Sequence, residues 1–400
     1  MMIRIAGGPV ARLSGERMIY LDNNATTPLD PAVIDVMLPF LREHFANPSS
    51  GYLPARPVRR AVDHAREQVA ALLDCTPEEI IFTSGGTEAD NAAIFSATQL
   101  FPDRKHIVTC AAEHDAVLNY CGWLEKHQGY EITRLGVTPD GVFRLEELEA
   151  AVRPGRTALV SLMWGNNETG VIAPIAEASA LAEKAGVLFH TDAVQAGGKI
   201  PLSLRDGQVH YLALSGHKFH APKGIGVLYV NHRVAFQPWM LGGGQENRRR
   251  AGTENVAGIA AIGEAAALAL KHIVAEPVDS IGALRDCFES ELAHRLPGVH
   301  FNGSAAPRTP NTSSLRIDGV EAAAMLVLLD RAGVCVSAGS ACHTGSSHVS
   351  HVLAAMGLTR EQAVQTIRVS LSRFTTRADL DAALTHFVSA AEKVRSLIPA

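Results

Sequence analysis

The amino-acid sequence predicts an α/β fold, with a large domain built on a mostly parallel β-sheet and a smaller α+β domain. Up to about residue 275, short apolar runs alternate with helical stretches. This alternation is typical of a mostly parallel sheet with helices on both faces. Beyond that point helices mix with short strands, and 400 residues are enough for two domains. We expect the large domain at 28–275 and the small domain at 1–27 together with 276–400.

The first ordered elements are expected to be helices. The residues before Met18 are rich in Gly, Ala and Arg without a pattern, as in a loose tail. A polar turn at 20–28 (YLDNNATTP) leads into a helix beginning near Pro31, because proline fits the first turn of a helix. NPSSG at 47–51 breaks the pattern, and a second helix is expected at about 58–73.

Apolar runs mark the strands of the large sheet. They are residues 80–83, 107–110, 158–163, 187–191, 209–214 and 225–230. The helices between them are expected to extend through Ala97, to follow His114, and to extend through Lys184. In the small domain we expect helices at 281–296, 321–332 and 378–398, and strands at 313–317, 333–337 and 367–371.

Composition argues against several classes of function. The formal net charge is −5 and no long basic run occurs, so nucleic acid is not the expected partner. No apolar stretch approaches the roughly 18 residues of a membrane span, and no signal-peptide pattern opens the chain. The six cysteines are irregularly spaced, which favours free thiols in a reducing compartment and hence a cytoplasmic protein. No spacing typical of a structural metal site occurs.

The segment SGHKFHAPKGIG at 215–226 places Lys218 in a polar turn between two expected strands. A lysine held near the core without being enclosed can have its pKa lowered by burial and by neighbours. Its amine is then free to form a Schiff base. A solvated surface lysine is the alternative, and most lysines are solvated.

A second candidate feature, TSGGTEA, joins the strand at 80–83 to the next helix. Its glycines let the backbone approach an anion, and a helix N-terminus supplies free N–H groups and partial positive charge. Gly86 and Thr87 would then hold a phosphate. An ordinary N-capped helix is the alternative, because Thr followed by acidic residues caps well.

Asp192 is a third candidate, at the end of the strand VLFHT. A lone carboxylate there is costly unless it has a cationic partner, and a protonated pyridine nitrogen is such a partner. A helix N-cap is the alternative. Together, Lys218, Asp192 and a phosphate cradle are what a pyridoxal 5′-phosphate (PLP) site needs.

Polar residues follow the ends of several expected strands. They are Thr87, His114, Asn167, Asp192, Gln195, His217 and Lys218. The carboxyl ends of the strands in an open α/β sheet form the edge where ligands bind. The sequence therefore predicts one ligand site at this edge.

A series of motifs, in this order, resembles those of the cysteine desulfurases. They are YLDNNATTP, NPSS, FTSGGTEADN, EHDAVL, MWGNNETG, HTDAVQ, SGHKFHAPKGIGVLY, RRAGTENV, SAGSAC and TIRVSLSRFTT. The resemblance covers nearly the whole chain from about Met18. It is greatest to the NifS type of the class-V aminotransferase family, group I, which keeps a long loop around the reactive cysteine. Such enzymes are PLP-dependent homodimers of transferase fold type I. They convert L-cysteine to L-alanine and leave a persulfide on an active-site cysteine.

The resemblance assigns roles around the cofactor ring. Lys218 would form the Schiff base and Asp192 would contact the pyridine nitrogen. His114 would stack on the ring and shuttle protons. Asn167 and Gln195 would hydrogen-bond near the phenolic oxygen, with Asn167 also contacting the substrate.

The same resemblance assigns residues to the phosphate. Gly86, Thr87, Ser215 and His217 would hold it. Thr253, in RRAGTEN, would reach the phosphate of the partner subunit's cofactor, which implies a homodimer with composite sites.

Arg368 resembles the arginine that binds the substrate carboxylate. A planar guanidinium can bond a carboxylate at two points. A structural ion pair is the alternative for Arg368, and it is the preferred interpretation for Arg373.

Cys342 resembles the persulfide cysteine. A nucleophilic thiol must be accessible and at least transiently ionised, and the small-residue loop SAGSACHTGSS would give access. Two residues depart from the common family pattern: His343 stands where a hydroxyl residue is more usual, and Gly85 where Cys or Ala is common. The remaining cysteines are expected to be structural: Cys75, Cys110, Cys121, Cys287 and Cys335.

The resemblance to NifS suggests Fe–S scaffold proteins as sulfur acceptors, including those that serve nitrogenase. Housekeeping cluster assembly is equally compatible. Cys342 would meet a cluster only transiently, and no resident metal is expected.

Other functions are compatible with parts of the sequence. Within the same fold, an aminotransferase, a kynureninase-like enzyme or a selenocysteine lyase is an alternative, although a transaminase has no use for Cys342. From another class, a metal or Fe–S carrier could use Cys342, His343, His348 and His351. Clusters usually need more thiols than this loop offers.

Overall fold

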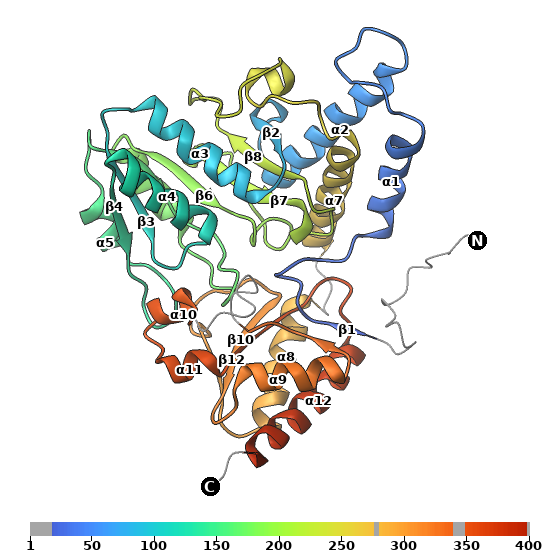
Figure 1. The fold of residues 1–400 in the computed structure, drawn as a ribbon, viewed down its shortest axis with the longest axis vertical. Helices are drawn as coiled ribbons and strands as arrows, with labels where there is room; N and C mark the ends of the chain where they lie inside the picture. Colours follow the sequence, from blue (N-terminus) through green and yellow to red (C-terminus); the bar gives the residue numbers. More distant parts are fainter. Residues whose placement is uncertain (1–17, 276–279, 339–348, 398–400) are drawn as a thin grey trace.

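The computed structural model describes residues 18–275, 280–338 and 349–397. Its elements form two parts along the long axis of the molecule (Figure 1). One part holds the large sheet and helices α1 to α7. The other holds short strands and helices from the C-terminal third.

A seven-stranded sheet organises the larger part, in the order β2-β8-β7-β6-β5-β3-β4. Its strands are β2 (Ile80–Thr83), β3 (His106–Cys110), β4 (Glu131–Leu135), β5 (Thr157–Ser161), β6 (Leu188–Asp192), β7 (Tyr211–Ser215) and β8 (Gly226–Val230). Strand β8 runs antiparallel to both of its neighbours, and the block from β7 to β4 is parallel. The expected mostly parallel sheet is confirmed.

Helices cover both faces of this sheet. They are α1 (Pro31–Arg42), α2 (Ala55–Leu73), α3 (Gly86–Leu100), α4 (Asp115–Gln128), α5 (Leu145–Ala151), α6 (Ile175–Lys184) and α7 (Val256–Ala275). Successive residues of one strand belong to different cores. Leu212 packs in one core, whereas Tyr211 and Ala213 pack in another. This arrangement explains why the strands read as continuous apolar runs.

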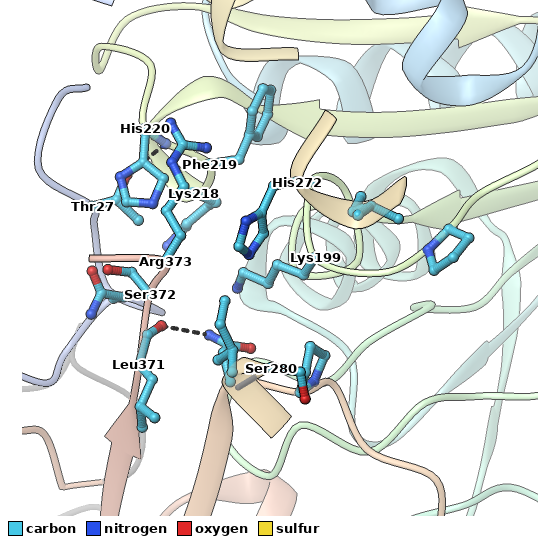
Figure 2. A pocket seen from close by; sticks show the side chains of 17 residues that line it. Thr27, Lys199, Lys218, Phe219, His220, His272, Ser280, Leu371, Ser372 and Arg373 are labelled. Atoms are coloured by element: carbon cyan, nitrogen blue, oxygen red, sulfur yellow. Dashed lines mark hydrogen bonds between the residues drawn. The ribbon is translucent and has the colours of Figure 1, made fainter. Parts of the chain in front are cut away.

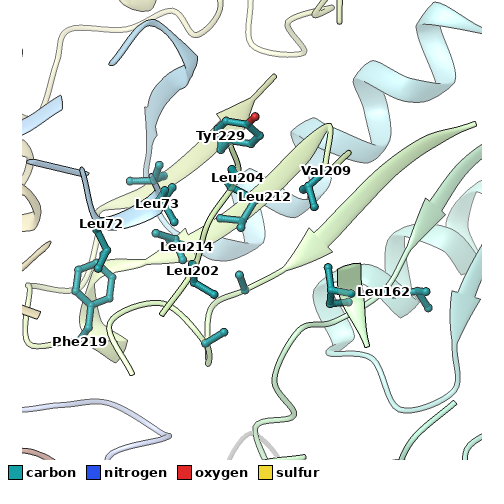
Figure 3. Packing of buried hydrophobic residues seen from close by; sticks show 14 of the residues in the cluster. Leu72, Leu73, Leu162, Leu202, Leu204, Val209, Leu212, Leu214, Phe219 and Tyr229 are labelled. Carbon is teal, nitrogen blue, oxygen red and sulfur yellow. The ribbon is translucent and has the colours of Figure 1, made fainter. Parts of the chain in front are cut away.

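The core on one face fixes the strands that flank the Lys218 turn. Figure 3 shows Leu212 and Leu214 of β7 and Tyr229 of β8 in this core, with Leu72 and Leu73 of α2. All five side chains are fully buried. The turn between β7 and β8 is therefore flanked by two strands that the core holds in place.

Strand β4 and helices α5 and α7 are elements that the sequence did not predict. Helix α7 is long and apolar enough, by length and composition, to cross a membrane. This finding corrects the expectation that no apolar stretch approaches that length. The helix contains Glu264 and Lys271 and packs against α1 and α2, as the core helix of a globular domain also does.

The smaller part has its own sheet and core. An antiparallel sheet has the order β12-β10-β9, and β1 pairs in parallel with β11. These strands are β1 (Ile19–Tyr20), β9 (Val299–Phe301), β10 (Thr312–Ile317), β11 (Val334–Cys335) and β12 (Thr366–Ser370). The helices are α8 (Ile281–Arg295), α9 (Ala322–Arg331), α10 (His351–Ala355), α11 (Arg360–Val364) and α12 (Arg377–Ser396). Ile19 and Leu21 share a core with α8, α9 and α12. The boundaries of the two expected domains stay a prediction.

Gly226 is a point of close approach between β8 and the start of α3. A Cβ at this position would lie 2.6 Å from the backbone of Gly85 and 2.7 Å from the carbonyl oxygen of Leu214. Neither neighbour is a flexible side chain. Glycine is therefore required for β8 to lie beside the loop that precedes α3.

We expect Gly226→Ala to destabilise the protein by about 1–3 kcal/mol, because the new methyl group overpacks a backbone contact. Gly122→Ala is the matched control. No atom lies within 4 Å of a Cβ built there, and alanine favours the helix α4. Thermal and denaturant unfolding of both variants would measure the difference. Equal midpoints for the two variants would contradict the packing argument.

Candidate active site

A cavity of about 310 Å³ lies at the carboxyl edge of the large sheet. It collects the site residues predicted from separate motifs. They are Gly86, Thr87, His114, Asn167, Asp192, Gln195, Ser215, His217, Lys218 and Arg368. These residues come from the ends of five strands of the large sheet and from one small-domain strand, so the cavity lies between the two parts.

Lys218 ends the 3₁₀ turn η2 (Gly216–Lys218), which joins β7 to β8. Its Nζ donates to the carbonyl oxygens of Asn24 (2.7 Å) and Ala25 (2.9 Å). The side chain is half-buried. The amine is therefore held near the core without being enclosed, as the sequence predicted.

Helix α3 begins at the cavity wall. Its N-cap is Gly85, which has no side chain to cap the first N–H groups. Glu88 accepts the N–H of Ser84, one residue before that cap. A Cβ on Gly86 would lie 2.7 Å from Cγ2 of Val194. The geometry favours an open, anion-accepting helix N-terminus over the capped helix.

The surroundings of His217 are strongly cationic. Burial lowers the pKa of this imidazole to about 4, and the charges of Lys218 and Lys223 act in the same direction. Its Nδ1 lies 3.2 Å from Oγ1 of Thr26. A phosphate bound beside α3 would offset this excess of positive charge.

Asp192 is a buried carboxyl at the end of β6. Its Oδ1 accepts the N–H of Val194 (2.9 Å), so it caps the following turn, as one sequence interpretation expected. Burial, followed by the nearby Asp90, raises the pKa of Asp192 to about 7. An ionised carboxylate here is costly without a cation beside it, and Asp192 also lines the cavity.

Asp90 and His190 are electrostatic neighbours of Asp192. Oδ1 of Asp90 is 3.3 Å from Nε2 of His190, and both residues are fully buried. Burial raises the pKa of Asp90 and lowers that of His190 to about 4. Both shifts favour the uncharged forms, so this pair does not supply the cation that Asp192 needs.

His114 is the N-cap of α4, and its Nδ1 accepts the N–H of Ala116 (3.1 Å). In the neutral ring Nδ1 is therefore unprotonated and Nε2 carries the hydrogen. One tautomer is fixed in a ring that lines the cavity.

Gln195 and Asn167 both bond to Asn24, Gln195 through its side-chain amide and Asn167 through its backbone carbonyl group. Nε2 of Gln195 donates to the carbonyl oxygen of Asn24 (3.0 Å). The carbonyl oxygen of Asn167 accepts from Nδ2 of Asn24 (3.2 Å). Asn24 therefore connects both predicted ring contacts.

Arg368 is only 2% exposed and forms an ion pair with Asp22 (2.8 Å). Its Nη1 donates to the carbonyl oxygen of Asn167 (2.9 Å). Its Nε has no hydrogen-bond partner among the described residues. The ion pair with Asp22 agrees with the structural alternative for Arg368, yet Arg368 also lines the cavity. Arg373 pairs with Asp30, as its structural interpretation expected.

Not every predicted site residue lies in this cavity. Thr253 is exposed in the segment before α7 and does not line the cavity of its own chain. Cys342, His343 and His348 lie outside the described residues. His351 does line the cavity, and its Nε2 donates to the carbonyl oxygen of Glu113 (2.8 Å). Within residues 18–275, 280–338 and 349–397, no cluster of three His, Cys, Asp or Glu residues is placed to hold a metal ion.

The described cysteines support their structural interpretation. Cys75, Cys110, Cys121 and Cys287 are free thiols. Burial raises the pKa of Cys110 and of Cys121 to about 12, and it raises that of Cys75 as well. A thiol that stays protonated is a poor nucleophile.

The cavity also contains residues that the sequence analysis did not single out. They are Asn24, Ala25, Asp90, Glu113, Asp115, Met163, Glu168 and Val194. All of them belong to the motifs that carry the family resemblance, so their place in a motif could have indicated them. His351 was considered only as a metal ligand, and no motif contains it.

The raised pKa of Asp192 gives a pH-dependent prediction for the protein freed of small ligands. Between its ordinary value of 3.8 and about 7, the folded state binds a proton that the unfolded state has lost. The stability from Asp192 is therefore present below pH 4 and lost as the pH rises through 7. Asparagine does not titrate. We expect Asp192→Asn to gain on the order of 1–3 kcal/mol relative to wild type between pH 5 and pH 8.

Denaturant unfolding at both pH values measures this gain. The surface variant Asp103→Asn is the control, and it should show no such change. Parallel stability curves for Asp192→Asn and wild type would contradict the raised pKa.

The comparisons with known proteins agree with the motifs. Residues 19–383 match the aminotransferase class-V family. A cysteine desulfurase of Trichormus azollae is 47% identical over 382 residues, which are 96% of this chain and 95% of that protein. Cysteine desulfurase NifS of Azotobacter vinelandii is 43% identical over 382 residues, 95% of this chain and 94% of that protein. A solved structure of a NifS-like protein, 36% identical, matches with a TM-score of 0.86 over 94% of this chain and 100% of that one. The predicted fold type I is thereby confirmed, and the chain belongs to the class-V aminotransferase family, within its cysteine desulfurases of the NifS type.

Proposed function

We propose that this protein is a PLP-dependent cysteine desulfurase, a sulfurtransferase that converts L-cysteine to L-alanine and passes the sulfur to Cys342. The observation that carries the proposal is the convergence of Lys218, Asp192 and the N-terminus of α3 in one cavity. It occurs in a chain whose relatives are named cysteine desulfurases.

The cavity suits PLP group by group. A protonated pyridine nitrogen would give the buried Asp192 carboxylate the cation that it otherwise lacks. The open N-terminus at Gly86 and the cationic surroundings of His217 suit a phosphate dianion. The Lys218 amine lies in the same cavity and can form the Schiff base.

When bound, PLP supplies an electron sink for negative charge at the substrate α-carbon. The protein's own groups hold and move protons around it. The Lys218 amine would take the α-proton and return it, and the carbonyl groups of Asn24 and Ala25 already hold that amine. His114, with its hydrogen on Nε2, would stack on the ring and exchange a second proton.

Arg368 would bind the carboxylate of L-cysteine, with Asn167 beside it. A guanidinium held in a fixed plane orients the substrate, because a bidentate contact leaves little rotation. Asp22 supplies this fixation at 2.8 Å. The buried Nε, which has no described partner, is a donor that a substrate would satisfy.

Cys342 would accept the sulfur. Its thiolate would attack the sulfur of the bound cysteine, and the new S–S bond would form as the C–S bond breaks. The electron pair of the C–S bond would stay with the substrate β-carbon, which takes a proton and becomes the methyl group of alanine. The support is the motif SAGSAC and the high pKa of buried thiols elsewhere in the chain. The persulfide would then serve an Fe–S scaffold protein of general or nitrogenase-directed assembly, as the likeness to NifS suggests.

A second copy of the chain would complete each site. Large apolar side chains are exposed near the start of the chain and before α7, namely Phe45 (90%), Leu53 (67%) and Leu241 (81%). Exposed apolar groups of this size favour a covered interface. Thr253 lies in the segment before α7. In the same segment, Arg250 forms an ion pair with Glu88 of α3 (2.9 Å). The contacts support a homodimer in which Thr253 reaches the partner's phosphate.

A reducing compartment such as the cytoplasm is proposed for this chemistry. Cys75, Cys110, Cys121 and Cys287 are free thiols, and a persulfide persists only where thiols are not oxidised to disulfides.

We expect Lys218→Ala and Cys342→Ala to separate cofactor attachment from sulfur transfer. Borohydride treatment of wild type loaded with PLP should leave a pyridoxyl mass on the peptide that contains Lys218. Cys342→Ala should keep this label and lose sulfide release from cysteine, because the sulfur has no acceptor. Lys218→Ala should lose the label at that peptide.

The matched control is Cys335→Ala, which should retain both label and activity. Alanine should form without an added keto acid, as it would not in an aminotransferase. Normal sulfide release by Cys342→Ala would refute the role of its thiol.

Mixed dimers test the proposed role of Thr253. Thr253→Asp would repel the phosphate, and Lys218→Ala removes the amine. In a mixed dimer, one site would combine Lys218 of one chain with Thr253 of the other. Random mixing of the two inactive variants should therefore restore about a quarter of wild-type activity.

Lys218→Ala mixed with Asp192→Asn is the control, because both changes affect the subunit's own site. This mixture should stay inactive. Recovery in neither mixture would argue that Thr253 does not serve the partner.

A further inference from the structure

Lys199, which the proposed mechanism does not use, lies directly behind Gln195. Its Nζ donates to Oε1 of Gln195 in a short hydrogen bond and to Oδ1 of Asn24 (3.0 Å). Lys199 lines a smaller cavity of about 150 Å³ rather than the main one. Figure 2 shows Lys199, Lys218 and His272 at the wall of this smaller cavity.

These contacts fix the orientation of the Gln195 amide. The carbonyl oxygen of Asn24 only accepts, so the group that faces it at 3.0 Å is the NH₂. The donating Nζ of Lys199 faces the amide oxygen. A flipped amide would lose both hydrogen bonds. The NH₂ has a second hydrogen, and Gln195 lines the main cavity, so the amide offers that cavity a donor.

Asn24, one of the two acceptors of Lys199, is itself held in place by hydrogen bonds. Oδ1 of Asn24 also accepts from Nδ2 of Asn311 (2.9 Å), and Nδ2 of Asn24 donates to Oγ1 of Thr312 (2.9 Å). Asn24 is fully buried. The acceptor of Lys199 is therefore held by the small-domain strand β10 and the segment before it.

We propose that Lys199 is a positioning residue for the bound cofactor. It locks the Gln195 amide with its NH₂ toward the cavity and places positive charge behind that donor, which stabilises a phenolate oxygen on the ligand. This inference rests on the proposed function, because it takes Gln195 to meet the phenolic oxygen of PLP.

The charges around Lys199 change when the cofactor binds. Burial, followed by the charges of Lys218 and Arg368, lowers the pKa of Lys199 well below its usual range. The other titratable groups facing this region are His217, His220, His272 and Arg373, with Asp22 and Asp30 paired to the two arginines. Joining Lys218 to PLP removes one repelling charge, and a phenolate adds an attracting one. Lys199 is then favoured as the ammonium.

The test follows the visible absorbance of the PLP-loaded full chain as a function of pH. A donor at the phenolic oxygen stabilises the unprotonated chromophore, so its loss raises the pH midpoint. Lys199→Met should raise the midpoint by about 1 pH unit. Lys199→Arg, which can donate to the same oxygens, should restore it. The exposed control Lys271→Met on α7 should leave it unchanged.

A double-mutant cycle shows whether Lys199 acts through Gln195. Gln195→Leu should raise the midpoint by a similar amount, and adding Lys199→Met should shift it little further. Additive shifts, or an unchanged midpoint in Lys199→Met, would overturn the proposal. If Lys199→Met does not fold, Lys199→Ala replaces it in the same titration, because water can fill the space beside the small cavity.

The two proposals fail in distinguishable ways. A wild-type protein without absorbance from PLP joined to Lys218 refutes the proposed function. A wild-type protein that titrates normally, beside an unshifted Lys199→Met, refutes only the role of Lys199.

Discussion

The site depends on a buried polar turn, residues 22–27, that lies between the large sheet and the small domain. On one side its carbonyl groups hold the amine of Lys218, and the backbone N–H of Thr27 donates to the carbonyl oxygen of His217 (2.9 Å). On the other side Asn24 bonds to the small domain through Thr312 and Ser370. A buried polar turn must satisfy its hydrogen bonds within the protein. The shape of the turn therefore fixes both neighbours, and the position of Lys218 follows from it.

Burial of charge is the second constraint. The acids at one side of the cavity have raised pKa values, as Asp90, Glu113 and Asp192 show. The bases have lowered pKa values, as shown by His217 in the cavity wall and by Lys199 next to Gln195. Both shifts move the groups toward neutrality, because an unpaired charge in a poorly solvated site is costly. A ligand with a cation near the acids and a dianion near the bases would reverse both pKa shifts. Clusters of residues with shifted pKa values are typical of functional sites.

The sequence predicted the sheet well because strands buried on both faces read as apolar runs. Strand β4 was not predicted because Glu131 and Arg134 interrupt its apolar pattern, as is possible in a strand at the edge of the sheet. The carboxyl-edge rule brought the predicted polar residues to one cavity, yet it could not reveal their partners. The ion pair of Arg368 with Asp22 joins residues 346 positions apart. The role proposed for Lys199 was not predicted for another reason. A lysine in a turn is expected to be solvated until the acceptors around it are known.

Two neighbouring lysines also show why a lowered pKa is not sufficient to identify a Schiff-base lysine. Burial lowers the pKa of Lys199, which is the property that the sequence analysis looked for in Lys218. Position separates them. Lys218 lines both cavities, whereas Lys199 lines only the smaller one. The Nζ of Lys199 is bound to two side-chain oxygens whose own partners are fixed. Access to the main cavity therefore favours Lys218 as the proposed Schiff-base lysine, and Lys199 keeps the positioning role proposed above.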